Sequence, residues 1–215
     1  MKSILLIGLG RFGMQMAHKL HELDQQVLAI DSSEQNVEDV LPYVTNAQIG
    51  DTTNPKLIAS LGVQNFDLCV VAIGDDFKSS LQTTALLKEY GAPFVLSRAN
   101  SDFHAKFLLR NGADEIIYPE QQMANWTAVS YSNDHIFGYV ELTQDYAIFE
   151  TDIPENWIGK TVVDLSVRRT YGINVLAVRN EDGMNPMPGL DYHFKEGDRI
   201  YILASQEAAA KFIPK

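Results

Sequence analysis

The sequence predicts an α/β protein in which a Rossmann-like domain with a parallel sheet is followed by a small α+β domain. Three observations predict this fold class. Short β-branched apolar runs alternate with segments of helical spacing from the start to about residue 118. A glycine-rich turn joins the first apolar run to the first helical segment. After Pro119 the sequence changes in style, and we predict domains at 1–133 and 134–215.

The first domain is predicted to contain strands at 4–7, 27–30, 47–49, 68–73, 94–96 and 115–118. Between the first two strands, apolar side chains recur at intervals of four, four and three residues, at Phe12, Met16, Leu20 and Leu23. This spacing predicts a helix that packs one apolar face against the sheet. Strands that alternate with helices form right-handed βαβ crossovers, so we expect a parallel sheet covered on both faces.

The second domain begins after a longer helical segment at 120–132. It is predicted to contain strands at 139–142, 147–151, 174–179 and 199–204, and helices at 163–171 and 206–212. Turn signals at 181–183 and 196–198 separate some of these elements. A domain of roughly 80 residues suits binding or pairing better than it suits a substrate pocket with its own catalytic set.

The composition of the chain indicates which partners, which cellular location and which covalent links to expect. The formal net charge is -11, which argues against nucleic acid or an anionic membrane surface as the principal partner. No apolar run approaches the roughly 18 to 20 residues that span a bilayer, and we expect a cytoplasmic protein. The single cysteine, Cys69, lies in an apolar run, so no disulfide forms within the chain and we expect a buried thiol.

The turn Gly8-x-Gly10-x-x-Gly13 follows the first predicted strand and opens the first predicted helix, which is the context of a dinucleotide-binding fingerprint. Gly8 allows the tight turn, Gly10 lets the backbone approach a phosphate, and Gly13 lets the helix lie close to the sheet. The free N–H groups of the helix then face the phosphate. Asp31 ends the second strand, where its carboxylate can accept hydrogen bonds from both ribose hydroxyls and would repel a 2'-phosphate.

Arg11 lies inside the glycine turn. Dinucleotide turns need no cation there, whereas a guanidinium suits a ligand with a more highly charged tail, such as ADP or ATP. A solvated surface arginine is the other interpretation. Further turn segments at 50–52, 74–76 and 97–99 follow predicted strands, where ligands bind in open α/β sheets, but each is also explained as an ordinary turn or helix cap.

The sequence lacks a recognisable proton-transfer set. The histidines, at 18, 21, 104, 135 and 193, are scattered, and no Gly-x-Ser-x-Gly, His-Glu-x-x-His or Cys-x-x-Cys motif is present. A nicotinamide dehydrogenase needs a proton donor or acceptor beside its hydride site. A binding module is therefore the leading hypothesis, and an NAD-dependent oxidoreductase is the alternative.

Together these features resemble the RCK family, the regulators of potassium conductance, and specifically the Trk/Ktr-type gating subunits of bacterial potassium uptake. The resemblance runs over essentially the whole chain. It is carried by the segments 8–13, 29–31, 71–74, 112–114 with 118–120, and 165–168 with 171–172.

The resemblance implies a subunit that is not an enzyme and that lies in the cytoplasm, at the inner face of the membrane. Domains of this family pair as dimers and assemble into a ring, here expected to be an octamer, under an integral membrane potassium-translocating subunit. The resemblance implies ATP or ADP as ligand, with NAD or NADH as the alternative. Exchange of nucleotides would change the shape of the ring and open or close the channel.

The resemblance also assigns site residues. The nucleotide would contact Gly8, Gly10, Arg11, Phe12, Gly13, Asp31, Ser32, Asp51, Thr52, Ala72, Ile73, Gly74 and Arg98. Among these, Asp51 and Thr52 would border the adenine, and Arg98 would stand near the phosphates. Arg11 would reach a terminal phosphate, expected to be that of the partner subunit's nucleotide.

Two further ligands are implied. Glu120 matches a position that helps to hold a divalent cation, Mg²⁺ or Ca²⁺, between subunits, although one carboxylate alone cannot make a site for a hard cation. The second domain resembles a cyclic di-AMP site, which would be formed by Val162, Val163, Arg168, Asn174 and Pro186.

Overall fold

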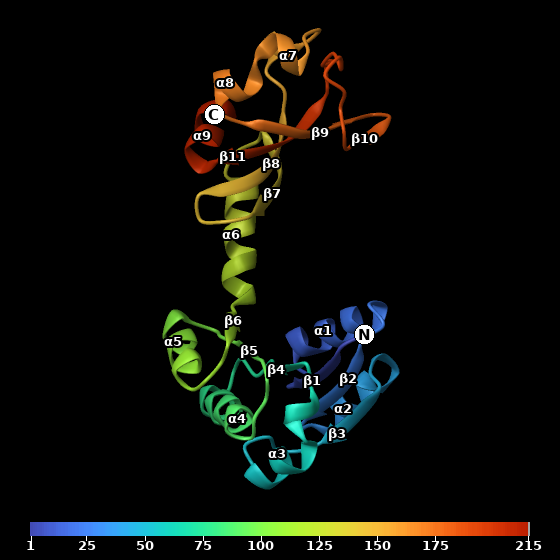
Figure 1. The fold of residues 1–215 in the computed structure, drawn as a ribbon, viewed down its shortest axis with the longest axis vertical. Helices are drawn as coiled ribbons and strands as arrows, with labels where there is room; N and C mark the ends of the chain where they lie inside the picture. The colour runs from blue at the N-terminus through green and yellow to red at the C-terminus, as the bar shows by residue number, and fades with distance from the viewer. Residues whose placement is uncertain (215) are drawn as a thin grey trace. The chain divides into compact units, whose positions relative to one another are not determined.

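The computed structural model describes residues 1–214, and the chain folds into two compact units, Met1–Glu120 and Gln121–Lys215 (Figure 1). This division falls within the helix that follows Pro119, and the predicted domain bounds at 1–133 and 134–215 stay a prediction. The first unit contains, in chain order, β1 (Ser3–Ile7), α1 (Arg11–Glu22), β2 (Gln26–Asp31), α2 (Glu34–Val40), the 3-10 helix η1 (Leu41–Tyr43), β3 (Asn46–Ile49), α3 (Pro55–Leu61), the 3-10 helix η2 (Val63–Asn65), β4 (Leu68–Val71), α4 (Phe77–Glu89), β5 (Val95–Arg98), α5 (Asp102–Arg110) and β6 (Glu115–Ile117).

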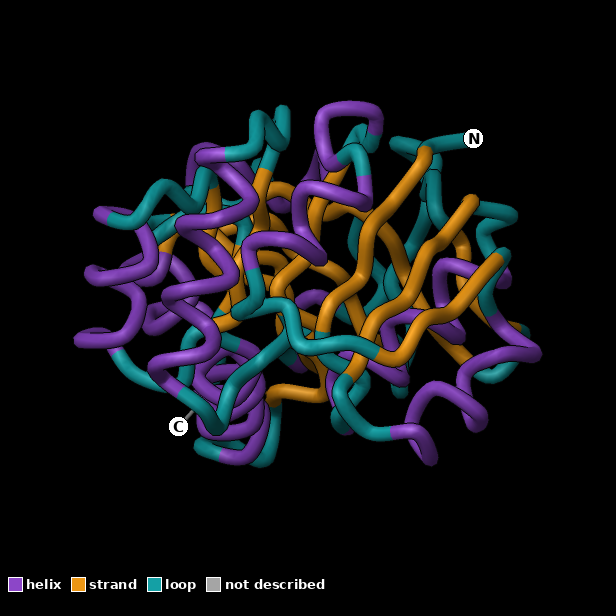
Figure 2. Tube along the Cα trace, turned by 90° about the horizontal axis from the view of Figure 1, so that it is seen from below, coloured by secondary structure: helices purple, strands orange, loops and turns teal. Residues whose placement is uncertain are grey.

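The strands of the first unit form a parallel sheet of order β3-β2-β1-β4-β5-β6, and helices lie on both sides of the strands (Figure 2). In β1, Leu5 and Ile7 pack in one apolar cluster with side chains of α3 and α4. Ile4 and Leu6 pack in the other cluster, with side chains of α1 and α2. Because both faces are covered, β1 is a continuous apolar run, and the predicted Rossmann-like sheet is confirmed.

Helix α1 lies close to the sheet through small side chains. Gly13 and Ala17 are its buried residues, and the larger side chains Phe12 and Met16 pack beside them, partly buried. The prediction that Leu23 continues this apolar face is wrong, because the helix ends at Glu22 and Leu23 is 55% exposed. Close approach of the helix axis to the sheet therefore depends on the glycine turn.

Helix α6 (Pro119–Tyr131) connects the two units along the chain. The second unit contains β7 (Ile136–Glu141), β8 (Tyr146–Asp152), the 3-10 helix η3 (Glu155–Trp157), α7 (Val162–Leu165), α8 (Val167–Tyr171), β9 (Asn174–Asn180), β10 (Gly183–Asn185), β11 (Arg199–Ser205) and α9 (Gln206–Phe212). Its strands pair antiparallel in the order β10-β9-β11-β8-β7, and a core around the fully buried Trp157 packs between sheet and helices. The predicted small α+β domain is confirmed.

Two details of the second unit differ from the prediction. The helix predicted at 163–171 is broken into α7 and α8, because Ser166 adopts a left-handed conformation with φ 47°. Strand β10 was not predicted, since Gly183-Met184-Asn185 has a turn-like composition and forms a strand only by pairing with β9. Within residues 1–214, no helix has the length and apolar character that a membrane span requires.

Candidate functional site

The carboxyl ends of the central strands of the first unit surround a cavity of about 750 Å³. It lies where strand order reverses between β1 and β4, the place where open α/β sheets bind ligands. The cavity is lined by all the residues predicted to contact a nucleotide except Gly13, namely Gly8, Gly10, Arg11, Phe12, Asp31, Ser32, Asp51, Thr52, Ala72, Ile73, Gly74 and Arg98. Gly13 lies beneath the cavity, in the first turn of α1.

The three glycines of the turn differ in backbone conformation and in the space that a side chain would have. Gly8 has φ 89°, and a Cβ there would lie 3.1 Å from the backbone nitrogen of Ile73. A Cβ on Gly13 would lie only 1.9 Å from the carbonyl oxygen of Gly8, so no side chain fits. A Cβ on Gly10 would meet nothing within 4 Å, which leaves open space in the cavity beside this residue.

The N-terminus of α1 faces this space without a side-chain cap. Gly10 is its N-cap residue, no side chain accepts from the first turn, and no acidic residue lies in that turn. The other long helices of the first unit have side-chain caps, for example Asp76 on α4 and Ser101 on α5. Uncapped N–H groups at a helix N-terminus attract an anion such as a phosphate.

Asp31 links the end of β2 to the glycine turn. Its Oδ2 accepts a hydrogen bond from the backbone N–H of Leu9 at 2.6 Å, and its Oδ1 accepts from the N–H of Ser33 at 2.8 Å. Each carboxylate oxygen has a further lone pair, so the side chain can still accept from two ribose hydroxyls. The carboxylate therefore supports the turn and borders the cavity at the same time.

The turn segments after β3 and β4 are ordered by side-chain hydrogen bonds. Asp51 accepts from the backbone N–H and hydroxyl of Thr53, which hold the pKa of Asp51 below its usual value. The buried Thr52 hydroxyl lies 2.9 Å from that of Thr83 on α4. Asp76 caps α4 by accepting from Ser79. These turns have structural roles of their own and also line the cavity.

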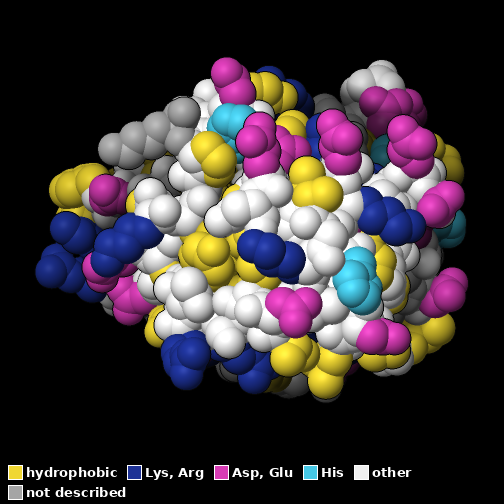
Figure 3. Space-filling view, turned by 90° about the horizontal axis from the view of Figure 1, so that it is seen from above, with side chains coloured by type: hydrophobic (Ala, Val, Ile, Leu, Met, Phe, Trp, Pro, Cys, Tyr) yellow, Lys and Arg dark blue, Asp and Glu magenta, His cyan; other side chains and the backbone are white. Residues whose placement is uncertain are grey.

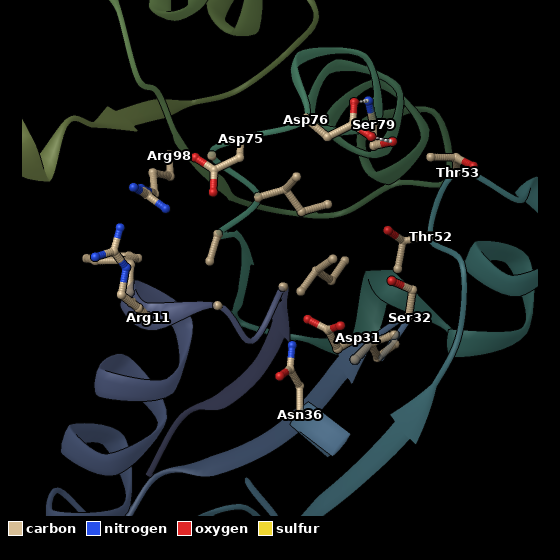
Figure 4. A pocket seen from close by; sticks show the side chains of 18 of the residues that line it. Arg11, Asp31, Ser32, Asn36, Thr52, Thr53, Asp75, Asp76, Ser79 and Arg98 are labelled. Atoms are coloured by element: carbon tan, nitrogen blue, oxygen red, sulfur yellow. Dashed lines mark hydrogen bonds between the residues drawn. The ribbon is translucent and has the colours of Figure 1, made fainter. Parts of the chain in front are cut away.

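The two arginines of the cavity lie at one end of it, where the carboxylates of Asp75 and Glu120 also lie. Figure 4 shows Arg11 and Arg98 together at one end, and Asp31, Ser32 and Thr52 at the other. Within residues 1–214, Arg11 has no ion pair or hydrogen bond from its side chain. A phosphate at this end would meet one uncommitted guanidinium and the uncapped N-terminus of α1.

Arg98 is already paired. Its Nη2 donates to Oε1 of Glu120, in the first turn of α6. Partial burial raises the pKa of Glu120, but a hydrogen bond from its own backbone N–H, the Arg98 pair and the charge of Arg11 lower it by more. Among residues 1–214, no group of three His, Cys, Asp or Glu side chains that could hold a metal ion includes Glu120. A cation shared between subunits stays a prediction.

The sequence analysis did not predict that several other residues line this cavity, namely Gln15, Asn36, Thr53, Ser79, Pro119 and Glu120. Gln15 lies one helical turn after Arg11, so helical spacing was the signal that could have found it. Asn36 lies in the first turn of α2, which directly follows Asp31 and the Ser33 cap.

The second unit has a cavity of about 710 Å³ between α7, α8 and the segment that follows β10. Val162, Val163, Arg168 and Pro186 line it, as predicted for a cyclic di-AMP site. Asn174 does not line it, so the predicted place of Asn174 in this site is wrong, although Ile173, Val175 and Leu176 do line the cavity. Figure 3 shows one face of the molecule, on which hydrophobic side chains gather beside Lys and Arg side chains.

Three other side chains of a kind that can carry chemistry, Cys69, His104 and His18, are packed against their surroundings. Burial raises the pKa of the Cys69 thiol to about 12, so it is not a nucleophile at neutral pH. His104 is fully buried, and desolvation lowers its pKa. The His18 ring packs against that of Tyr43 in a tilted arrangement, with centroids 3.9 Å apart, and the part of the chain that the structure describes contains no group of three possible His, Cys, Asp or Glu metal ligands.

The model of the TrkA-N domain matches residues 4–119, and the model of the TrkA-C domain matches residues 147–215. The chain is 34% identical to "Ktr system potassium uptake protein A" of Bacillus subtilis, covering 98% of this chain and 95% of that protein. It is 32% identical to "Ktr system potassium uptake protein C" of the same organism, covering 98% and 96%. The Vibrio alginolyticus "Ktr system potassium uptake protein A" is 30% identical, covering 97% and 95%.

Solved structures share the fold over the whole chain. "GsuK channel bound to NAD" superposes with a TM-score of 0.69 at 12% identity, covering 100% of this chain and 40% of that longer chain. "Crystal Structure of the GsuK RCK domain" gives 0.68 at 12% identity, covering 100% and 48%. At this identity the likeness establishes the fold, with both units in it.

Proposed function

The chain belongs to the TrkA family, the RCK-type regulatory subunits of Ktr and Trk potassium uptake systems, and on that premise we propose that it gates a membrane potassium-translocating subunit by binding adenine nucleotides. The observation that carries the proposal is the cavity of the first unit. An uncapped helix N-terminus and Arg11 lie at one end of it, and Asp31 lies at the other.

The nucleotide is proposed to lie with its ribose at Asp31 and its phosphates at the turn. Gly10 leaves room for a phosphate against the backbone, and Arg11 supplies an uncommitted charge for a terminal phosphate. ADP and ATP place more negative charge at that end than NAD does, so they are the ligands we propose first. NAD and NADH are the alternative. Asp31 would repel a 2'-phosphate, which disfavours NADP.

Gating requires two states that differ in affinity for the ligands. We propose that copies of the first unit pair, that the assembly is a ring, and that exchange of nucleotides changes its shape and thereby the channel. In the ring, Arg11 is proposed to reach the terminal phosphate of the nucleotide in the partner subunit. The subunit is proposed to act in the cytoplasm, without turnover of the nucleotide.

The test begins with the purified chain. Thermal unfolding is measured with ATP, ADP, NAD, NADH and adenosine in parallel, because a ligand that binds only the folded state stabilises it by mass action. We expect ADP and ATP to raise the midpoint most. Potassium flux through proteoliposomes that contain a Ktr-type membrane subunit is then measured with and without the chain. The proposal would be refuted if no nucleotide raised the midpoint of thermal unfolding. It would also be refuted if potassium flux in the presence of the chain did not change when nucleotides were added.

The second unit is proposed to bind cyclic di-AMP at its own cavity. Arg168 supplies a guanidinium for phosphate, and Val162, Val163 and Pro186 supply apolar walls for the base. Calorimetry with the wild-type chain and with Arg168→Ala is the test. Equal binding by the two proteins would remove Arg168 from the site, and absence of heat with the wild type would remove the site.

A further inference from the structure

Arg98 is held in place by the wall of the nucleotide cavity. A Cβ built on Gly74 would lie 2.6 Å from its Nη1 and 2.7 Å from its Cζ, and this Cζ lies 5.8 Å from the centre of the Phe12 ring. The side chain is 13% exposed. The missing side chain at Gly74 therefore leaves room for this guanidinium, which lies at the end of the cavity where Arg11 also lies.

The positive charge of Arg98 is balanced by the carboxylate of Glu120. Within residues 1–214, Glu120 is its ion-pair partner, while its buried Nε has no hydrogen-bond partner. A guanidinium has five N–H donors and binds an anion through two of them at once, so this pair uses only part of its capacity. The Glu120 side chain is 56% exposed, and water can replace Arg98 as its partner.

A phosphate that bound to Arg98 would compete with the Glu120 carboxylate for this guanidinium. Glu120 lines the cavity end that also contains Arg11, Phe12 and Arg98, and a phosphate bound at this end would offer two oxygen acceptors to the guanidinium, as a carboxylate does. A phosphate carries more negative charge than a carboxylate and also meets the uncapped N-terminus of α1. It is therefore the stronger partner for Arg98.

We propose that Glu120 is an internal anion that occupies the phosphate side of Arg98, so that a bound nucleotide must displace it. The inference rests on the proposed function and assigns Glu120 a role within this chain. Displacement frees the first turn of α6 from the wall of the cavity, and the chain continues through α6 into the second unit. Nucleotide binding and attachment of α6 then oppose each other, and their coupling is reciprocal.

The variant Glu120→Gln tests this competition, because glutamine keeps the size of the side chain and removes its charge. Binding of ADP and adenosine is measured by calorimetry in EDTA, so that no divalent cation contributes. The matched control is Glu115→Gln, on β6, which makes the same change of net charge at an exposed residue with no ion pair within residues 1–214. Circular dichroism and thermal unfolding confirm that each variant is folded.

We expect Glu120→Gln to bind ADP about two- to tenfold more tightly than wild type, with adenosine unchanged, because adenosine has no phosphate to compete. Glu115→Gln should match wild type. In an Arg98→Ala background, the gain in ADP affinity from Glu120→Gln should be smaller than in the wild-type background, because the competition for Arg98 is absent. Hydrogen exchange of peptides from 119–131 should be faster in ligand-free Glu120→Gln than in Glu115→Gln.

The outcomes separate the inference from the proposed function. If the wild type binds none of the nucleotides, the proposed function fails. If the wild type binds ADP but Glu120→Gln binds it equally or more weakly in EDTA, the competition is refuted while the nucleotide site stands. If ADP affinity rises but exchange in 119–131 does not change, the release of α6 is refuted.

Discussion

We predict different effects for alanine substitutions at Gly13 and Gly10, because the space around these two glycines of the turn differs. In Gly13→Ala, the new Cβ would lie 1.9 Å from the carbonyl oxygen of Gly8, whereas a Cβ essentially never approaches another heavy atom within 3.0 Å. The turn must move away from α1, which disturbs the 2.8 Å hydrogen bond from the Gly8 N–H to the Ile30 carbonyl. In Gly10→Ala, the new Cβ meets nothing within 4 Å, and φ of -64° suits alanine.

Gly13→Ala should therefore destabilise the first unit by about 3 kcal/mol, the upper end of the usual cost of overpacking, because the obstacle is backbone. For a unit of this size, this corresponds to a fall of roughly 12 °C in its thermal midpoint. Gly10→Ala should change stability by less than about 0.5 kcal/mol. It should nevertheless weaken ADP binding by about tenfold or more, because its methyl group fills the space proposed for a phosphate.

The assay is thermal unfolding followed by circular dichroism, with and without ADP, on wild type and both variants. The comparison of the two alanine variants controls for the residue type. A Gly13→Ala protein that unfolds within about 2 °C of wild type would contradict the packing argument. A Gly10→Ala protein that binds ADP as well as wild type would show that no phosphate lies against that backbone.

Further predictions concern single side chains. Asp31→Ala should weaken ADP about ten- to a hundredfold by calorimetry and also lower the midpoint of thermal unfolding, because the ribose and the Leu9 N–H both lose a charged acceptor; ADP affinity within a factor of two of wild type would contradict this. Arg11→Ala should weaken ATP by about 1.5 to 3 kcal/mol while leaving AMP nearly unchanged in the same titration, and equal losses would show that Arg11 does not contact the terminal phosphate. Desolvation raises the pKa of Asp114, but hydrogen bonds from the Val95 N–H and Lys88 lower it by more, so its stabilising contribution is present above the ordinary aspartate value of about 4 and is lost as the pH falls through the lowered pKa. Asp114→Asn should make acid unfolding, followed by circular dichroism, less steep there than in wild type, and an identical acid transition would contradict the assignment.

Local rules predicted the first unit well. A parallel strand covered on both faces must be apolar at successive positions, so β1 and β4 were visible as apolar runs. The glycine turn could also be predicted from the sequence. Gly8 has a positive φ and Gly13 has no room for a Cβ, and each of these conditions selects glycine at its own position. The same reasoning placed Asp31 at the end of β2.

Contacts between distant residues were decided by the tertiary structure. Arg98 and Glu120 are 22 residues apart, and their pairing depends on how β5 and the start of α6 are brought together. The absence of Asn174 from the lining of the second cavity depends on how β9 packs against the helices, and Ser166 breaks the predicted helix at 163–171 by its left-handed conformation. The sequence by itself determined the elements and the residue types at the turn, because these follow from local sterics and periodicity. Only the folded chain decided which charges meet, because that depends on register and helix packing over the whole unit.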